Sequence, residues 1–156
     1  MYYDYYETGM IGVLTLAADD QGLRYVFFPE GRNTLPVQDD WRRRPERFGE
    51  VKRQLAAYFK RELNSFDLDL APEGTDFQLR VWAALARIPY GTVATYKSIA
   101  EAVGNPRAVR AVGGATGKNP IPIIIPCHRV IGSNGSLTGF GGGLRTKSLL
   151  LDLEKR

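Results

Sequence analysis

Residues 125–130 read Ile125-Pro126-Cys127-His128-Arg129-Val130 and hold the only cysteine and the only histidine of a 156-residue chain. A thiolate is a strong nucleophile, and imidazole is the side chain best suited to removing a thiol proton near neutral pH. Three consecutive isoleucines precede Pro126, and such an apolar run predicts a short buried extended segment that the proline ends. We therefore expect the thiol at the edge of a core, inside a pocket.

A lone cysteine is usually a small buried apolar residue without chemistry. Side chains that are adjacent in sequence do not generally face each other, so the neighbouring His128 does not by itself establish a catalytic pair. The rest of the chain has to distinguish the two interpretations.

The composition sets the broad class of the protein. The apolar fraction of 44% and the charged fraction of 24% are ordinary for a soluble domain. One cysteine excludes an intramolecular disulfide, and one cysteine with one histidine excludes the usual structural zinc site. No signal peptide or membrane-spanning run is visible, so we expect a cytoplasmic protein. The net charge of +4 suits an anionic partner.

The first half of the chain predicts strands followed by a helix. Residues 2–28 have β-rich composition, with a turn at residues 19–22 that makes a hairpin or meander. Residues 31–41 read as a loop. Residues 45–64 carry an apolar stripe at helical spacing, and residues 66–70 alternate as an edge strand does. Residues 71–74 break the pattern, which predicts domains at 1–72 and 73–156.

The second half predicts short helices. Thr75 and Gln78 form a capping box for the first one, and Thr95 caps a second that Gly104 ends. A turn at Asn105-Pro106 leads to a third helix over residues 107–116. Helix, tight turn and helix at this spacing indicate a helix-turn-helix.

The third helix has an unusual composition. Gly113 and Gly114 are adjacent in it, and each costs on the order of 1 kcal/mol relative to alanine. One explanation is tight packing against another element. The other is a slim helix that lies close in the DNA minor groove, with Arg110 acting in place of a base.

The segment after the Cys-His pair predicts a hairpin and a pocket wall. Residues 130–138 read as the wing of a winged helix, with a type I′ turn at Asn134-Gly135. Residues 139–143 are rich in glycine but lack the Lys-Ser/Thr of a phosphate loop, so we expect them to approach a flat ligand on which Phe140 stacks. A last helix over residues 144–154 buries Leu149, Leu150 and Leu153 and brings Glu154 toward the Cys-His pair.

These segments together resemble the O6-alkylguanine-DNA alkyltransferases, also called methylated-DNA–protein-cysteine methyltransferases. The resemblance rests on Pro126-Cys127-His128-Arg129-Val130 after Asn119-Pro120-Ile121-Pro122, and on Arg110-Ala111-Val112-Gly113-Gly114-Ala115. It covers residues 75–156, whereas the first 70 residues match only in size and element order. It implies an α/β protein: a ribonuclease-H-like N-terminal domain, with a small antiparallel sheet and a helix, and a winged-helix-like catalytic and DNA-binding domain.

The resemblance also implies catalytic roles. Cys127 would be the nucleophile and final alkyl acceptor. His128 would deprotonate it through a bridging water, and Glu154 would orient the histidine. Asn119 would brace the turn that holds the cysteine. Tyr96 would rotate the target nucleotide and protonate the leaving purine.

Two surfaces follow from the same resemblance. The base pocket would be lined by Tyr96, Val130, Ser133, Phe140 and Gly141. The DNA contacts would come from Gln78, Thr95, Tyr96, Lys97, Asn105, Arg110, Ala111, Gly113, Gly114 and Ser133.

The implied activity is irreversible, stoichiometric repair by a monomer that needs neither a metal nor another cofactor. Its partner is double-stranded DNA that contains O6-alkylguanine, with O4-methylthymine as a further candidate, and the base must be flipped out to be reached. The implied compartment is the cytoplasm, or the nucleus in a eukaryote. Phe140 replaces a tyrosine of many relatives, and Gly141 replaces a larger or polar residue of some, so the pocket's tolerance for bulky groups is open.

Two other functions remain to be distinguished. A winged-helix module could sense alkylated bases or regulate transcription without chemistry, and a cysteine hydrolase could use the same Cys-His pair. A protein that repairs DNA acquires one alkyl group on Cys127 and stops. A binding module acquires none, and a hydrolase turns over.

Overall fold

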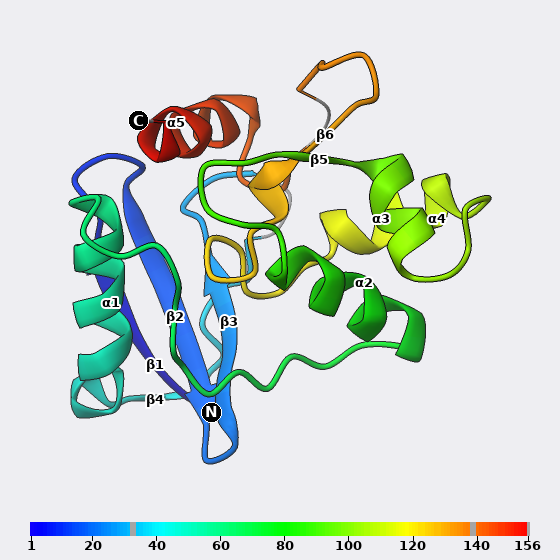
Figure 1. Ribbon diagram of the computed structural model, residues 1–156. Coiled ribbons are helices and arrows are strands. Elements are labelled where there is room, and N and C mark those ends of the chain that lie inside the picture. The colour runs from blue at the N-terminus through cyan, green and yellow to red at the C-terminus, as the bar shows by residue number, and fades with distance from the viewer. Residues whose placement is uncertain (32–33, 138–139, 156) are drawn as a thin grey trace.

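A small sheet forms the first third of the protein. The computed structural model describes residues 1–31, 34–137 and 140–155. Strands β1 (Tyr2–Glu7), β2 (Val13–Asp19) and β3 (Gly22–Phe27) pair antiparallel, and the short β4 (Arg42–Arg43) runs parallel to β1, in the order β3-β2-β1-β4 (Figure 1). The prediction of an antiparallel sheet is therefore correct for the three long strands. The parallel β4 at one edge makes the whole sheet mixed.

The helix that covers this sheet is shorter than the sequence predicts. Residues 45–48 form a 3-10 turn, η1 (Pro45–Phe48), and α1 (Gly49–Phe59) follows. The helix ends before residue 64 because Arg61 adopts a left-handed conformation, with φ of 61°. Two backbone bonds then close the last turn, from Arg61 to the Tyr58 carbonyl and from Glu62 to the Ala57 carbonyl.

The edge strand predicted at residues 66–70 is wrong. Only one bridge forms, a parallel one between Leu70 and Leu23 of β3. Further along the same edge, the Val26 amide donates to the Pro120 carbonyl at 2.9 Å. The edge of β3 is thus shared between this linker and a loop of the C-terminal half, which leaves no room for a longer ladder.

The C-terminal half is mainly helical. Its elements are α2 (Asp76–Ala86), β5 (Ala94–Thr95), α3 (Tyr96–Ala102), α4 (Val109–Gly117), the 3-10 turn η2 (Cys127–Arg129), β6 (Val130–Ile131) and α5 (Leu144–Glu154). Both predicted N-caps are present as capping boxes, Thr75 with Gln78 and Thr95 with Ser98. The third predicted helix begins and ends slightly later than expected, as α4.

The predicted wing is not a hairpin of two strands in the described residues. Strand β6 instead pairs in parallel with β5, Ala94 opposite Val130 and Thr95 opposite Ile131. The chain does reverse after β6, through bonds from Gly135 to the Gly132 carbonyl and from Gly132 to the Ser136 carbonyl. Only Gly135 has a positive φ there, at 82°, whereas a type I′ turn needs two. Residues 138 and 139 of the predicted hairpin lie outside the described residues.

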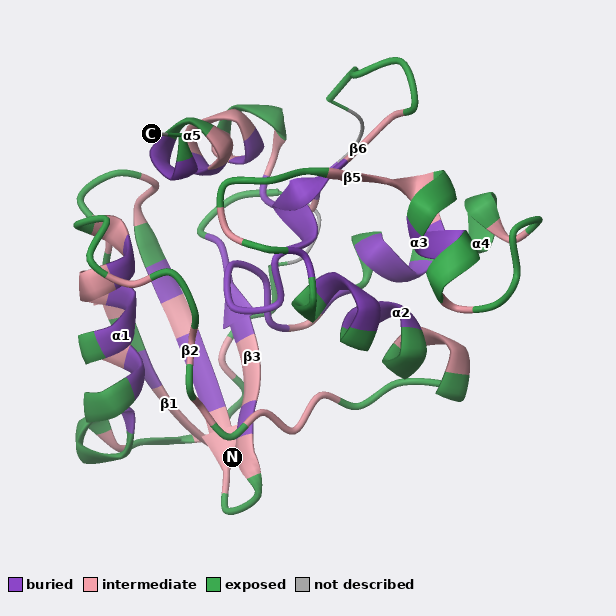
Figure 2. Ribbon diagram, in the orientation of Figure 1, coloured by how far each residue is buried: buried purple, intermediate pink, exposed green. Residues whose placement is uncertain are grey.

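One apolar core joins the two halves. The loop from Ile121 to Val130 is buried throughout, and it lies between the sheet and the C-terminal helices (Figure 2). Side chains of β2, β3, α1, α2, α5 and this loop belong to a single cluster. Among the described residues, none of the helices has the length and apolarity needed to cross a bilayer.

Candidate active site and nucleic-acid interface

Cys127 is held by the loop that precedes it. The Asn119 side chain donates to the Ile125 carbonyl at 2.8 Å and accepts from the Ile121 amide at 3.0 Å, so it ties both ends of the isoleucine run together. Within the run, Ile123 adopts a left-handed backbone with φ of 73°, which is strained for a β-branched residue. The isoleucines thus form a buried tight turn, not the extended segment that the sequence predicts.

The structure brings His128 and Glu154 together from distant parts of the chain. Nε2 of His128, in η2, lies 2.6 Å from Oε2 of Glu154, which is the last residue of α5. The His128 side chain is fully buried and that of Glu154 is 2% exposed. Nδ1 of His128 is buried and has no hydrogen-bond partner among the described residues. With the carboxylate accepting the Nε2 proton, the Nδ1 lone pair is available to take a proton.

Arg129 completes the support of the carboxylate. Its Nε donates to Oε1 of Glu154 at 2.7 Å and its second amino group to Oε2 at 3.1 Å, while the first donates to the Ile88 carbonyl at 2.6 Å. Tyr58 of α1 adds a hydroxyl that donates to Oε2 at 2.5 Å. Sequence reasoning missed both residues, although Arg129 sits inside the motif.

The pKa shifts at the site follow from burial and these bonds. Burial raises the pKa of the Cys127 thiol to about 11, against smaller opposing effects of Asn119 and Lys147. Burial lowers the pKa of His128, and the hydrogen bond to Glu154 opposes it. Burial raises the pKa of Glu154, but hydrogen bonds from His128 and Arg129 outweigh it and hold that pKa at about 2. The resting thiol is therefore protonated and needs a base, and the carboxylate is ionised.

Lys147 is a third buried group that sequence reasoning missed. Its side chain is fully buried on α5, and Nζ donates to the Val130 carbonyl at 2.6 Å. Burial lowers its pKa, and the Cys127 thiolate opposes that shift. Its spacing from Leu150 and Glu154 on one helix face is the signal that could have identified it. Leu149, which was expected to be buried, is only half-buried.

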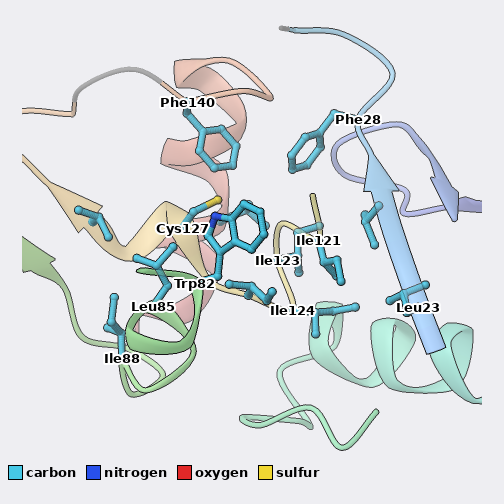
Figure 3. Packing of buried hydrophobic residues seen from close by; sticks show 14 of the residues in the cluster. Leu23, Phe28, Trp82, Leu85, Ile88, Ile121, Ile123, Ile124, Cys127 and Phe140 are labelled. Carbon is cyan, nitrogen blue, oxygen red and sulfur yellow. The ribbon is translucent and has the colours of Figure 1, made fainter. Parts of the chain in front are cut away.

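The glycine-rich segment before α5 packs against the N-terminal half. The rings of Phe28 and Phe140 are turned toward each other, with centroids 5.5 Å apart (Figure 3). A Cβ at Gly142 would meet the Phe28 ring, and one at Gly31 would overlap the Gly141 carbonyl. Glycine is thus needed at Gly31 for the close approach of two backbones and at Gly142 to leave room for the Phe28 ring. The predicted wall residues Phe140 and Gly141 are held by the N-terminal half.

The predicted DNA contacts lie mainly on the outer side of α3 and α4 and in the loops beside them. Val112, Ala115 and Thr116 are buried, and Trp82 donates to the Ala115 carbonyl at 2.8 Å, which fixes α4 on α2. The exposed predicted residues are Lys97, Asn105, Arg110, Ala111, Gly114 and Ser133, whereas Gln78, Thr95, Tyr96 and Gly113 are half-buried. The oxygen of the Gln78 side chain is occupied by its capping box.

The two explanations for the glycines of α4 are now distinguishable. A Cβ at Gly113 or Gly114 would meet no other atom within 4 Å. Tight packing inside this chain therefore does not explain them. The remaining explanation is a slim exposed helix that lies close to DNA. The half of the chain that carries this helix is basic: residues 73–156 hold 11 of the 21 Lys and Arg residues but only 5 of the 17 Asp and Glu residues.

The predicted residues Thr95, Tyr96 and Val130 are connected to the Cys127 turn through β5 and β6. Tyr96 begins α3 immediately after Thr95, whose partner Ile131 directly follows Val130. This pairing fixes the start of α3 relative to the turn that holds Cys127. In the described part of the chain, no group of three or more His, Cys, Asp or Glu side chains is placed to hold a metal ion.

Comparison with known proteins matches nearly the whole chain. Residues 76–156 match the model of the 6-O-methylguanine DNA methyltransferase DNA binding domain, and residues 1–72 that of its ribonuclease-like domain. A methylated-DNA–protein-cysteine methyltransferase of Methanosarcina acetivorans is 55% identical over 154 residues, 99% of this chain and 98% of the relative. One of Mycobacterium tuberculosis is 50% identical over 145 residues, 93% of this chain and 87% of the relative.

Solved structures agree with the sequence matches. The OGT of Mycobacterium tuberculosis in complex with DNA superposes with a TM-score of 0.92 at 47% identity, covering 99% of this chain and 93% of that one. An O6-methylguanine-DNA methyltransferase of Pyrococcus kodakaraensis shares the fold, with a TM-score of 0.68 at 22% identity and 98% of both chains covered.

Proposed function

The chain belongs to the 6-O-methylguanine DNA methyltransferase family, a family of DNA-repair transferases, and on that premise we propose which of its residues carry out the transfer. Cys127 accepts the alkyl group, His128 takes the thiol proton, and Glu154 holds the histidine. The observation that carries this assignment is the buried pair of His128 Nε2 and Glu154 Oε2 beside an unpartnered Nδ1.

The proton moves first. The thiol, with a pKa of about 11, is protonated at neutral pH. His128 Nδ1 accepts its proton through one bridging water, and the ionised Glu154 stabilises the imidazolium that forms. Lys147 adds a positive charge near the sulfur, which favours the thiolate. Asn119 keeps the turn in place and its side chain favours the thiolate as well.

The transfer itself is a displacement at saturated carbon. The Cys127 sulfur forms a bond to the alkyl carbon as the bond from that carbon to guanine O6 breaks, and the electron pair goes to the purine. Tyr96 donates a proton to the purine, which makes it a better leaving group. The product thioether has no easy exit, so each molecule acts once.

Access to the base requires extrusion from the duplex. An O6-alkyl group lies inside the helix, so the nucleotide rotates into the site and Arg110 fills the gap it leaves. Exposure of Arg110 and the open space around Gly114 support this arrangement. The base then lies between the Phe140–Gly141 wall and the backbone of Val130, beside Ser133. O4-methylthymine is a second candidate substrate of the same pocket.

The partner is double-stranded DNA, and the protein acts as a monomer. The similar OGT of Mycobacterium tuberculosis was solved in complex with DNA. The contacts come from the residues predicted for this surface. No metal or cofactor is needed for a displacement by a thiolate. A thiol that must stay reduced indicates the cytoplasm, or the nucleus in a eukaryote.

Intact-protein and peptide mass spectrometry tests the assignment. The protein is incubated with a duplex that contains one O6-methylguanine, and Cys127→Ser serves as the control. We expect one added methyl on the Cys127 peptide, stoichiometric with protein and absent from the control. An unmodified Cys127 on tightly bound, intact DNA would favour a damage-binding module, and repeated turnover would favour a hydrolase.

The same assay tests extrusion. Arg110→Ala should slow methyl transfer at least about tenfold from duplex DNA and much less from a single strand, because a single strand has no gap to fill. Arg107→Ala, an exposed charge in the turn before α4, is the matched control. Equal slowing on both substrates would contradict the role of Arg110 in extrusion.

A further inference from the structure

A tyrosine of the N-terminal half reaches the catalytic carboxylate. Tyr58 lies on α1, 96 residues before Glu154, and its side chain is fully buried. Its hydroxyl donates to Oε2 at 2.5 Å, and Oε2 is also the oxygen paired with His128 Nε2. No feature of the sequence connects this helix to the Cys-His motif.

We propose that Tyr58 is a positioning residue of the relay, whose hydroxyl binds the Glu154 oxygen that pairs with His128, lowers the basicity of that carboxylate, and so makes the reactivity of Cys127 depend on docking of the N-terminal half. The proposal rests on the catalytic roles assigned above. It adds to them a residue outside the half of the chain that carries the cysteine and the DNA surface.

The packing around Tyr58 fixes the direction of its hydroxyl. The ring meets Phe59 edge-on with centroids 5.2 Å apart, Phe66 at 5.4 Å and Tyr90 at 6.3 Å. The ring is thereby held from its own helix, from the linker and from the C-terminal half. Few other orientations are open to it, so the bond to Glu154 is preorganised.

The hydroxyl acts as a donor and not as an anion. Burial and the Glu154 charge raise the pKa of Tyr58 far above its ordinary value, and Arg129 lowers it by less. The groups that bind the carboxylate are Tyr58 from α1 and His128 and Arg129 from η2. Two further titratable groups lie next to these partners: Lys147 from α5 acts on His128, and Tyr90 from the loop after α2 acts on Tyr58. Tyr58 is the one among them that the N-terminal half supplies.

Loss of the Tyr58 hydroxyl should shift the pKa of His128 in a predictable direction. A carboxylate that accepts one hydrogen bond fewer is more basic and stabilises a neighbouring imidazolium more strongly. In Tyr58→Phe the pKa of His128 should therefore rise, and more of the histidine is then protonated and unable to accept the thiol proton at a given pH. A tyrosine that only fills space would leave this pKa unchanged.

The single histidine makes the test direct. Its imidazole gives one set of carbon-bound proton signals, so NMR titration of the free protein reports His128 alone. In Tyr58→Phe we expect the His128 pKa to rise by about half to one pH unit, and the acid limb of the rate of Cys127 methylation to move by the same amount. Tyr6→Phe, which removes the hydroxyl of a half-buried tyrosine on β1 of the same half, should move neither.

A second variant covers the case in which Tyr58→Phe does not fold. A fluorinated tyrosine at position 58 keeps the ring but is a stronger donor, so the His128 pKa should fall. Unchanged titration in both variants would overturn the proposal. The titration of His128 needs no DNA, so it tests the effect of Tyr58 independently of methyl transfer. The assigned role of His128 is tested by His128→Gln: if this variant still accepts a methyl group at the normal rate, that role is wrong.

Discussion

The buried groups next to Cys127 (the proposed relay of His128, Glu154, Arg129 and Tyr58) and the outer surface of α4 differ in how their polar groups are satisfied. In the relay, Glu154 is buried and receives donors from Tyr58, His128 and Arg129. On α4, Arg110 is exposed and Gly114 has open space in front of it. Buried charges must be compensated inside the protein, because desolvation without partners is costly. A surface that meets DNA has to leave its contacts unmade until the DNA arrives.

This contrast predicts the largest effect for a change inside the relay. Arg129→Met removes the guanidinium that binds both oxygens of Glu154 and leaves a buried carboxylate short of donors. We expect a loss of about 3–5 kcal/mol in the free energy of unfolding, measured by urea denaturation, and no detectable methylation of Cys127.

An exposed ion pair supplies the control for that change. Arg53 and Glu50 pair on the surface of α1, so Arg53→Met should leave both the unfolding curve and the methylation unchanged. Similar losses in the free energy of unfolding for the two variants would show that burial does not increase the contribution of the Arg129–Glu154 pair to stability.

Acidification should weaken the fold through the same relay. The pKa values of Glu154 and His128 are both lower in the folded protein than their ordinary values of 4.5 and 6.5. Both groups therefore stabilise the fold at neutral pH, and this stabilisation is lost as the pH falls below about 6.5 toward the folded Glu154 pKa of about 2. Urea unfolding measured from pH 7 to pH 3 should show the decline.

Glu154→Gln separates the carboxylate from the rest of the protein. It should be less stable than the parent at pH 7, and its stability should depend less on pH below 5. An equally steep decline in this variant would place the acid sensitivity elsewhere, for example at the buried Asp4, which pairs with Arg43 and Lys52.

The smallest effect on stability, and of opposite sign, belongs to the exposed helix. Gly114→Ala adds a methyl group that meets nothing in the chain and should stabilise the protein by about 0.5–1 kcal/mol in thermal unfolding. The same methyl group narrows the approach to the minor groove, so affinity for duplex DNA should fall several-fold in a fluorescence anisotropy titration.

Gly49→Ala is the matched control, since Gly49 begins α1 and also has open space around its Cβ position. It should leave the DNA affinity unchanged. If Gly114→Ala also binds DNA normally, the slim-helix explanation of the glycines is wrong.

Local signals in the sequence were reliable where a short stretch determines the structure. The capping boxes at Thr75 and Thr95 and the last helix over residues 144–154 are confirmed. The helix predicted to residue 64 ends at Phe59, because the stripe that suggested it continues past a left-handed residue. The predicted hairpin at residues 130–138 failed for a different reason: β6 pairs with β5, a partner 36 residues earlier in the chain.

The sequence by itself determined the family, the cysteine–histidine pair and the glycine-bearing helix, because each is written in contiguous residues or in a fixed local spacing. Only the tertiary structure decided which groups surround the carboxylate of Glu154, that Lys147 is buried beside Val130, and that Phe28 and Gly31 contact Phe140 and Gly141. These contacts join residues up to 96 positions apart. Their energy depends on burial and on the direction of individual donors, and neither is encoded in any short segment.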